Sequence, residues 1–189
     1  MENRALAWGY TLLEVLVTLA IAGLLTALAV PGYRELTARN RGSAAVNELF
    51  GALQLARESA TFYRTTTTMC PSAGAGCGTD WGAGYLIFVD RNGNGVPDPN
   101  DRVLARGTAL HGGASLSWRS FRRRPFLQYT SRGLTHAENG SFVYCSGAGA
   151  ADPALKIVIN TAGRARLVRD DSLDGRFDDG SGPSGCPRP

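Results

Sequence analysis

The sequence predicts an α+β fold in which a long N-terminal helix, membrane-spanning over its first half, packs on a C-terminal antiparallel β-sheet domain. Three observations predict it. Residues 10–30 form an apolar run in which Glu14 is the only charged side chain. A helical repeat of apolar residues then continues to about Tyr63. After Arg64 the repeat changes to two residues, and glycine becomes frequent beyond residue 70.

We divide the chain into four parts. Residues 1–9 are expected to be a leader peptide, and residues 10–30 a transmembrane and assembly helix, long enough to cross a bilayer. Residues 31–63 are the expected amphipathic continuation of that helix. Residues 64–189 are the expected β-rich globular domain, with an irregular tail.

The amphipathic half of the helix carries apolar residues at steps of three and four, which places them on one face. They are Val46, Leu49, Phe50, Leu53, Ala56 and Ala60. Polar residues take much of the other side. This pattern predicts a helix that packs one stripe against a domain.

Eight segments with a two-residue period follow, separated by clusters of Gly, Asn, Pro and Asp. The candidate strands are Thr66–Cys70, Tyr85–Asp90, Arg102–Arg106, Ser115–Ser120, Phe126–Thr130, Ser141–Cys145, Leu155–Asn160 and Arg164–Arg169. Short strands with short links indicate antiparallel sheet packed on the helix.

The charge is unevenly distributed. The net charge is +4, and Lys156 is the only lysine among 20 basic residues. Residues 102–137 contain seven arginines and no acid, whereas residues 170–179 contain five acids and one arginine. We therefore expect a surface with patches of opposite sign.

Four cysteines allow three disulfide pairings. A domain exported across the membrane would meet an oxidising compartment, where disulfides form. We favour Cys70–Cys77, which closes a short loop, and Cys145–Cys186, which would hold the Gly/Pro-rich tail. Free or mixed thiols are the alternative.

The segment Gly9-Tyr10-Thr11-Leu12-Leu13-Glu14 and the later Pro31 resemble the N-terminus of type IV pilins and pseudopilins. The resemblance implies that a prepilin peptidase cuts after Gly9 and that Tyr10 becomes a methylated N-terminus. It also implies that the Glu14 carboxylate lies near the amino group of a neighbouring pilin subunit during assembly. Such a pair offsets the free-energy penalty of an acid in an apolar bundle.

Later motifs are similar to the FimT/GspH branch of that superfamily. They are Cys70-Pro71-Ser72, Gly84-Tyr85-Leu86-Ile87-Phe88-Val89-Asp90, Asn92-Gly93-Asn94-Gly95 and Gly163-Arg164-Ala165-Arg166. The FimT-like reading implies a minor type IV pilin, in a group whose Gly-Arg-x-Arg element is linked to DNA binding during natural transformation. The alternative is a GspH-like minor pseudopilin of a type II secretion system, with protein contacts only. A structural pilus primer without affinity for DNA is a third reading.

Two arginine clusters are candidates for non-specific DNA binding. Arg164 and Arg166 lie two residues apart on an expected strand, so both would point to one face. Arg169, on the same expected strand, is a further candidate, although it lies across the pleat from that pair unless a bulge intervenes. The second cluster, Arg122-Arg123-Arg124, is interleaved with aromatic residues, as in single-strand binding sites. For both clusters the alternative is a solvated surface.

The segment from Asp90 to Asp101 resembles a calcium loop, but a hairpin turn is the favoured interpretation. The oxygen ligands of that loop would be Asp90, Asn92, Asn94, Asp98 and Asp101. We expect no other metal site, no cofactor and no small-molecule substrate. No nucleophile–base pair or phosphate loop is recognisable, so we do not expect an enzyme.

The location follows from the resemblance. We expect a single-pass protein of the bacterial inner membrane with a periplasmic globular domain. After assembly with other pilin subunits, the domain would lie on a pilus at the cell surface.

Overall fold

A computed structural model describes residues 10–135, 138–147, 155–169, 177 and 186 of the chain. These residues fall in two compact units, Met1–Thr37 and Ala38–Pro189. Each unit is described by itself below. The expected cleavage residue Gly9 lies outside the described residues.

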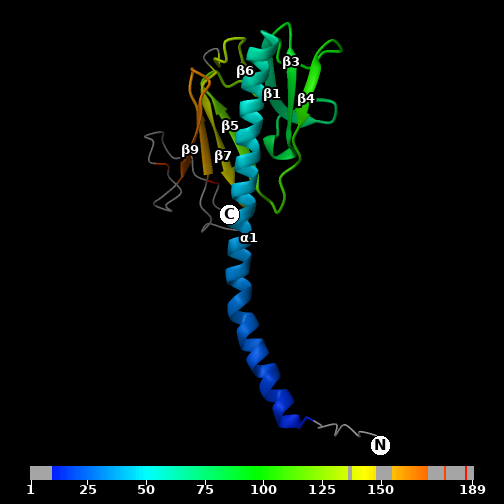
Figure 1. Ribbon diagram of the computed structural model, residues 1–189, viewed down its shortest axis with the longest axis vertical. Helices are drawn as coiled ribbons and strands as arrows, with labels where there is room; N and C mark the ends of the chain where they lie inside the picture. Colours follow the sequence, from blue (N-terminus) through cyan, green and yellow to red (C-terminus); the bar gives the residue numbers. More distant parts are fainter. Residues whose placement is uncertain (1–9, 136–137, 148–154, 170–176, 178–185, 187–189) are drawn as a thin grey trace, which may run out of the picture. The chain divides into compact units, whose positions relative to one another are not determined.

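Helix α1 runs from Leu12 to Tyr63 and contributes to both units (Figure 1). In the first unit its large apolar side chains are exposed on every side. Among the described residues, α1 is the one helix long and apolar enough to cross a membrane. The helix begins with a Thr-x-x-Glu pattern, in which the backbone N–H of Glu14 donates to Thr11 Oγ1 at 3.3 Å. This threonine satisfies a donor that the first turn otherwise leaves unpaired.

The second unit contains two antiparallel sheets and one short 3₁₀ helix, η1 (Trp81–Ala83). The first sheet consists of β1 (Thr66–Ala73), β2 (Gly76–Cys77), β3 (Tyr85–Asp90), β4 (Arg102–Arg106) and β6 (Leu127–Tyr129). The second sheet has the order β5 (Ser115–Ser120), β7 (Gly140–Cys145), β8 (Leu155–Ile159) and β9 (Ala165–Arg169).

The predicted α+β class is confirmed, and all eight expected strands are present to within a few residues at their ends. Two features differ from the sequence analysis. The chain forms two separate sheets, because β6 pairs with β1 and not with its sequence neighbour β5. The strand β2 was not expected; it forms because the chain turns back at Gly74 and pairs Gly76 with Ala73.

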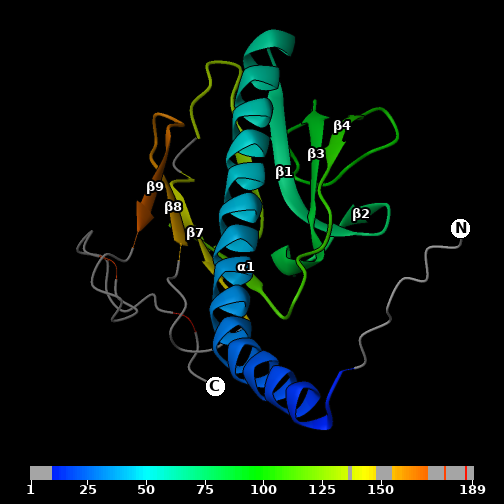
Figure 2. The ribbon, with the colours of Figure 1, turned by 60° about the horizontal axis from the view of Figure 1, so that its bottom comes forward.

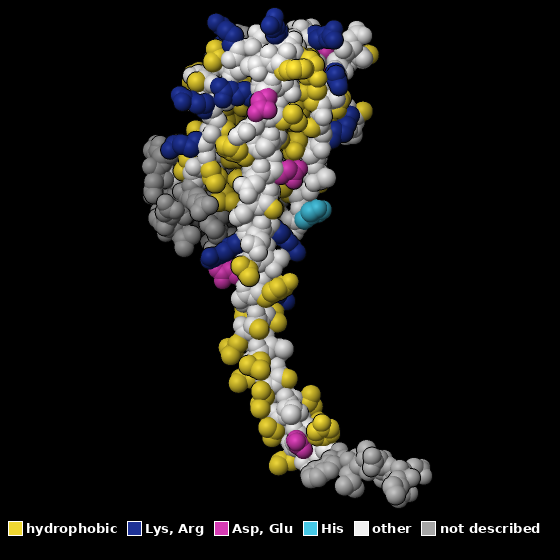
Figure 3. Space-filling model, in the orientation of Figure 1, with side chains coloured by type: hydrophobic (Ala, Val, Ile, Leu, Met, Phe, Trp, Pro, Cys, Tyr) yellow, Lys and Arg dark blue, Asp and Glu magenta, His cyan; other side chains and the backbone are white. Residues whose placement is uncertain are grey.

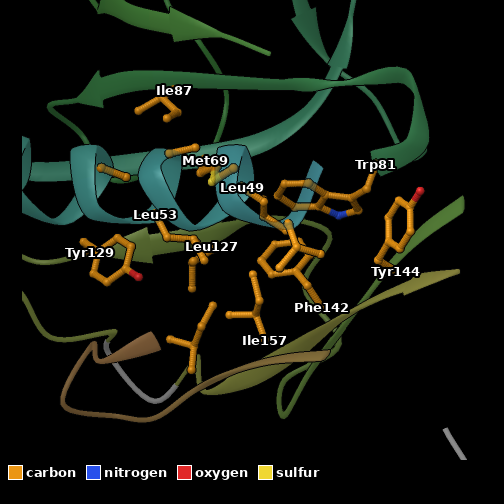
Figure 4. Close-up of a cluster of buried hydrophobic side chains, with 14 of the residues drawn as sticks. Leu49, Leu53, Met69, Trp81, Ile87, Leu127, Tyr129, Phe142, Tyr144 and Ile157 are labelled. Carbon is orange, nitrogen blue, oxygen red and sulfur yellow. The ribbon is translucent and has the colours of Figure 1, made fainter. Parts of the chain in front are cut away.

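The core lies where one stripe of α1 meets both sheets (Figures 2 and 4). Leu49 and Leu53 of α1 pack with Met69 and Ile87 from the first sheet and with Phe142 from the second. Further along the stripe the helix presents alanines instead of larger residues. Ala56 and Ala60 are fully buried, so the methyl group of each lets strands approach the helix backbone closely.

Two disulfide bonds link Cys70 to Cys77 and Cys145 to Cys186, which is the pairing favoured from the sequence. The first closes the β1–β2 hairpin. The second ties residue 186 to the end of β7, in a small apolar cluster with Val143 and Phe177. Phe177 and Cys186 thus lie on the face of the second sheet that points away from α1.

Truncating Leu53 to alanine is expected to destabilise the folded unit by about 2–5 kcal/mol, because it leaves a cavity where both sheets meet the helix. Leu55→Ala is the matched control on the exposed side of the same helix, with an expected loss of about 0.5 kcal/mol. Denaturant unfolding of the full chain in detergent, followed by tryptophan fluorescence, measures both. Equal losses would contradict the assignment of this stripe to the core.

Candidate functional site

One end of the second unit gathers the termini of strands that are distant in sequence. In the first sheet, the start of β1 pairs with the end of β3 through Thr66 and Asp90, and Val89 pairs with Arg102 at the start of β4. Helix α1 ends at the same place, since the Arg102 guanidinium carbon lies 5.7 Å from the ring centroid of Tyr63.

The second sheet contributes the ends of its own strands to this end. Ser120 of β5, Gly140 of β7, Ile159 of β8 and Ala165 of β9 follow one another in register across the sheet. The loop after β6 joins the two sheets, because the Thr135 N–H donates to the carbonyl of Thr161 at 3.2 Å.

We call this surface the arginine-rich end, because exposed arginines follow or precede nearly every strand that terminates there. Its members are Arg64, Arg91, Arg102, Arg122, Arg123, Arg132, Arg164 and, one residue into β9, Arg166. Figure 3 shows basic side chains around the upper end of the folded unit. Among the described acids nearby, Asp98 and Asp101 accept hydrogen bonds within their own loop, and Glu58 is exposed.

Two of these arginines adopt backbone conformations that favour glycine. Arg64 has φ 52° where α1 ends, and Arg123 has φ 55° in the loop between β5 and β6. They are the only described residues other than glycine with positive φ. A left-handed backbone raises the free energy of such a residue by about 1–2 kcal/mol. Sites of this kind are associated with function.

The predicted cluster Arg122-Arg123-Arg124 divides into two roles. Arg122 and Arg123 are exposed beside Phe121, whose side chain is 78% exposed. Arg124 instead forms an ion pair with Glu138, with 2.7 Å between Nη1 and Oε1. Its carbonyl also accepts the indole N–H of Trp118. Arg124 therefore serves the fold, and we leave it out of the candidate interface.

Arg164 and Arg166 lie in different local structures. Arg164 precedes β9 in a turn, where its N–H donates to Asn160 Oδ1 at 2.9 Å. Arg166 is exposed on β9, in register with Val158. The sequence analysis predicted both arginines on one strand. In the structure the strand begins at Ala165, because Arg164 still belongs to the turn that precedes β9. The side chain of Arg169 lies outside the described residues.

The turn before β9 is held against the loop after β6 by two close approaches. Arg57 of α1 donates from Nε to the Gly133 carbonyl and from Nη2 to the Ala162 carbonyl, both at 3.1 Å. Gly163 has φ 73°, and a Cβ there would lie 2.1 Å from the Gly133 oxygen. Only glycine fits, which explains the glycine of the Gly-Arg-x-Arg element physically.

A groove of about 530 Å³ lies beside this contact. Its lining comes from α1, from β6 with the loop that follows, and from the turn before β9. The lining residues include Phe50, Gln54, Glu58, Tyr129, Arg132 and Arg164. Burial raises the pKa of Tyr129 well above its usual value, against the opposing effect of the Arg57 charge. The hydroxyl therefore stays neutral and can donate a hydrogen bond.

The loop suggested for calcium is a hydrogen-bonded turn. The buried Asp90 carboxylate accepts the N–H groups of Gly93, Asn94 and Gly95 and the hydroxyl of Thr68. Among the described residues, no group of three or more His, Cys, Asp or Glu is arranged to hold a metal ion. The Asp90 carboxylate thus accepts hydrogen bonds from the turn that it holds, and we make no metal proposal for this loop.

A family model described as type II transport protein GspH matches residues 45–163. The match covers more than half of the sequence. The chain belongs to the GspH family. The matched region includes α1 from Ala45 onward, the first sheet and the turn that ends at Gly163.

Curated relatives of this GspH-family chain match it over part of their length. A fimbrial protein of Pseudomonas aeruginosa is 46% identical over 52 residues, which are 28% of this chain and 33% of that protein. The type IV major fimbrial protein FimA of Dichelobacter nodosus (strain VCS1703A) is 30% identical over 97 residues, 51% of this chain and 57% of that protein. The chain thus spans less than two thirds of either relative.

Solved structures share the fold of this GspH-family chain. The type IV minor pilin FimU of Pseudomonas aeruginosa (strain PAO1) has a TM-score of 0.55 at 24% identity, covering 70% of this chain and 91% of that one. The minor pseudopilin EpsH of the Vibrio cholerae type 2 secretion system has a TM-score of 0.52 at 13% identity, covering 68% and 97%. These likenesses confirm the predicted type IV pilin-like fold.

Several residues of the arginine-rich end were missed from the sequence of this GspH-family member. Arg64, Arg91 and Arg102 are single arginines, each separated from the others by many residues. The available signal was their position: each one directly follows or opens a secondary-structure element, or lies in the loop after one. Arg57 and Tyr129 gave no such signal, since both fit an ordinary amphipathic pattern.

Replacing Glu138 by glutamine is expected to change how stability depends on pH. Burial raises the pKa of Glu138, although Arg124 and the N–H of Gln128 act in the opposite direction. The folded state thus holds this proton more tightly than the unfolded chain. Its contribution to stability is fully present below the unfolded pKa and is lost as pH rises through the folded value. Glu138→Gln should remove that loss.

Denaturant unfolding of both proteins at a series of pH values from the acid range to neutrality measures this effect. We expect the wild type to lose stability relative to Glu138→Gln as pH rises. A stability difference between the two proteins that stays constant with pH, or that changes in the other direction, would show that the ion pair with Arg124 offsets the effect of burial on the pKa of Glu138.

Proposed function

We propose that this protein is a minor subunit of a type IV pilus and that its arginine-rich end binds DNA without sequence specificity, for uptake in natural transformation. The arginine-rich end carries the proposal. Exposed arginines from both sheets and from the end of α1 share one surface. Arginine suits phosphate because its planar guanidinium forms paired hydrogen bonds with two oxygens.

The loop between β5 and β6 supports contact with the strand itself. Phe121 is exposed between Ser120 and the pair Arg122-Arg123, so it can stack on a base while the arginines contact phosphates. Arg123 keeps a left-handed backbone at this tip, where glycine would be favoured for the fold alone.

The same proposal places residues 10–30 in the bacterial inner membrane before assembly, with the second unit on the periplasmic side. Cleavage after Gly9 by a prepilin peptidase and methylation of Tyr10 would complete the subunit. The exposed apolar surface of α1 in the first unit supports contact with other pilin subunits, since no described residue of that unit covers it.

A second candidate is a minor pseudopilin of a type II secretion system, with a structural role and no affinity for DNA. The description of the matching family model favours it. DNA binding separates the two candidates, because a pseudopilin needs only protein contacts.

The pair Arg164→Ala with Arg166→Ala is expected to weaken binding to a DNA duplex, and so is the pair Arg122→Ala with Arg123→Ala. The logarithm of affinity falls as the logarithm of salt concentration rises, and each lost phosphate contact makes that fall less steep by about 0.9. Each pair should therefore make the slope less steep by about 1.8. Fluorescence anisotropy of the full chain in detergent, titrated at several salt concentrations, measures the slope.

The matched control is Arg41→Ala with Arg106→Ala, which removes the same charge from exposed positions of the second unit outside the arginine-rich end. We expect it to leave the slope nearly unchanged. Equal effects of test and control pairs would contradict a defined interface. Absence of DNA binding at low salt would favour the pseudopilin candidate.

Glu14→Gln is expected to reduce incorporation of the protein into fibres, because it removes the one charge in the apolar run without changing side-chain size. The amount in sheared fibres, relative to the amount in membranes, measures incorporation. Thr18→Ala is the control, one turn further along the exposed helix. Normal incorporation of Glu14→Gln would contradict a role of Glu14 in assembly.

A further inference from the structure

The groove beside the turn before β9 holds an unusual set of polar groups. Its volume, about 530 Å³, is in the range of small-ligand sites. One wall is the face of α1 that carries Phe50, Gln54 and Glu58. The opposite wall carries Arg132 and Arg164, both exposed members of the arginine-rich end.

Among the described residues, the guanidinium of Arg57, which also lines the groove, has only neutral acceptors. Its hydrogen bonds go to the carbonyls of Gly133 and Ala162, and within the described residues no carboxylate forms an ion pair with it. A partly buried positive charge without a counter-charge attracts an anion. With Arg132 and Arg164, three guanidinium groups line one groove.

Tyr129 supplies an independent observation. The residue is 1% exposed and lines the groove, and its hydroxyl forms no hydrogen bond with any described residue. The hydroxyl is not itself enclosed, because the one enclosed side-chain polar atom without a partner among the described residues is Thr67 Oγ1. It is therefore a donor that a bound acceptor can reach.

The chemistry of both walls limits which class of ligand the groove can hold. A free phosphate would satisfy the arginines, but it would be repelled by Glu58 and would leave most of the volume empty. A nucleotide offers phosphate oxygens to the arginines, an aromatic face to Phe50, and amino and carbonyl groups to Glu58 and Gln54. A base stacked and paired inside a duplex presents neither its face nor its pairing edge.

We propose that this groove binds one unstacked nucleotide of single-stranded DNA. Arg132 and Arg164 hold its phosphate, and the Tyr129 hydroxyl donates a hydrogen bond to a further acceptor of the nucleotide. The inference rests on the proposed function and adds a preference for the single strand. The arginine-rich end contacts the backbone of either form of DNA, whereas the groove takes a base that has left its stack.

The test compares a fluorescein-labelled oligodeoxycytidylate with a duplex of matched length, both titrated against the full chain in detergent. Tyr129→Phe should weaken binding of the single strand by about tenfold and leave the duplex unchanged, because one hydrogen bond to a charged acceptor is lost. Deoxycytidine monophosphate should displace the single strand and not the duplex.

Tyr85→Phe is the matched control, since it removes the hydroxyl of a half-buried tyrosine that donates to Glu48 at 3.4 Å and does not line the groove. We expect no change in its affinity for either DNA. Thermal unfolding of both variants shows whether they fold like the wild type. Arg132→Ala provides a second variant at an exposed position, with the same expected loss for the single strand.

Three results would overturn the proposal. The first is single-strand affinity that is unaffected by Tyr129→Phe and Arg132→Ala; the proposed DNA binding would then stand without the groove. The second is equal displacement by inorganic phosphate, which would mean an anion site only. The third is displacement by tetraglutamate as effective as that by the nucleotide, which would indicate a groove for protein carboxylates.

If neither form of DNA bound at low salt, the proposed function would fail by itself. Calorimetric titration with deoxycytidine monophosphate alone then tests whether the groove binds a nucleotide. Binding by the wild type that Tyr129→Phe abolishes would support a nucleotide site, and no measurable binding by the wild type would overturn it.

Discussion

The second unit depends on one helical stripe that packs on two sheets at once. The buried residues of α1 contact β1 and β3 on one side and β7 and β8 on the other, so neither sheet has a core of its own on that face. The buried alanines Ala56 and Ala60 set the closest approach. Because the two sheets share this support, the loops at their ends are brought to one surface although they are far apart in sequence.

The same helix also organises the candidate site. Arg57 reaches from α1 to the loops of both sheets, and its two carbonyl partners fix the distance between them. Gly163 permits the approach that these hydrogen bonds require. An ion pair between Arg124 and the buried Glu138 anchors the neighbouring loop. Structural arginines thus hold the scaffold, and exposed arginines next to them remain available for a ligand.

The helix and the eight strands were predictable because each depends on a local repeat: apolar steps of three and four along α1, and alternation in segments such as Tyr85–Asp90. The division into two sheets was not predictable, since alternation along a segment does not show which strands pair, here β6 with β1. For the site, the Arg122–Arg124 run was recognisable as a cluster. Its separation into exposed residues and the paired Arg124 required Glu138, which is 14 residues away. The groove needed Tyr129 beside the turn of Arg164, a proximity that no sequence pattern encodes.

The bond between Cys145 and Cys186 has a topological consequence. It closes a covalent ring that begins at the end of β7, passes through β8 and β9, and returns to β7. The hairpin that carries Arg164 at its tip lies inside this ring. Exposed turns are the preferred targets of proteases. A single nick anywhere between residues 146 and 185 would leave both fragments of the ring attached to β7, so a protease would need two cuts to remove the hairpin.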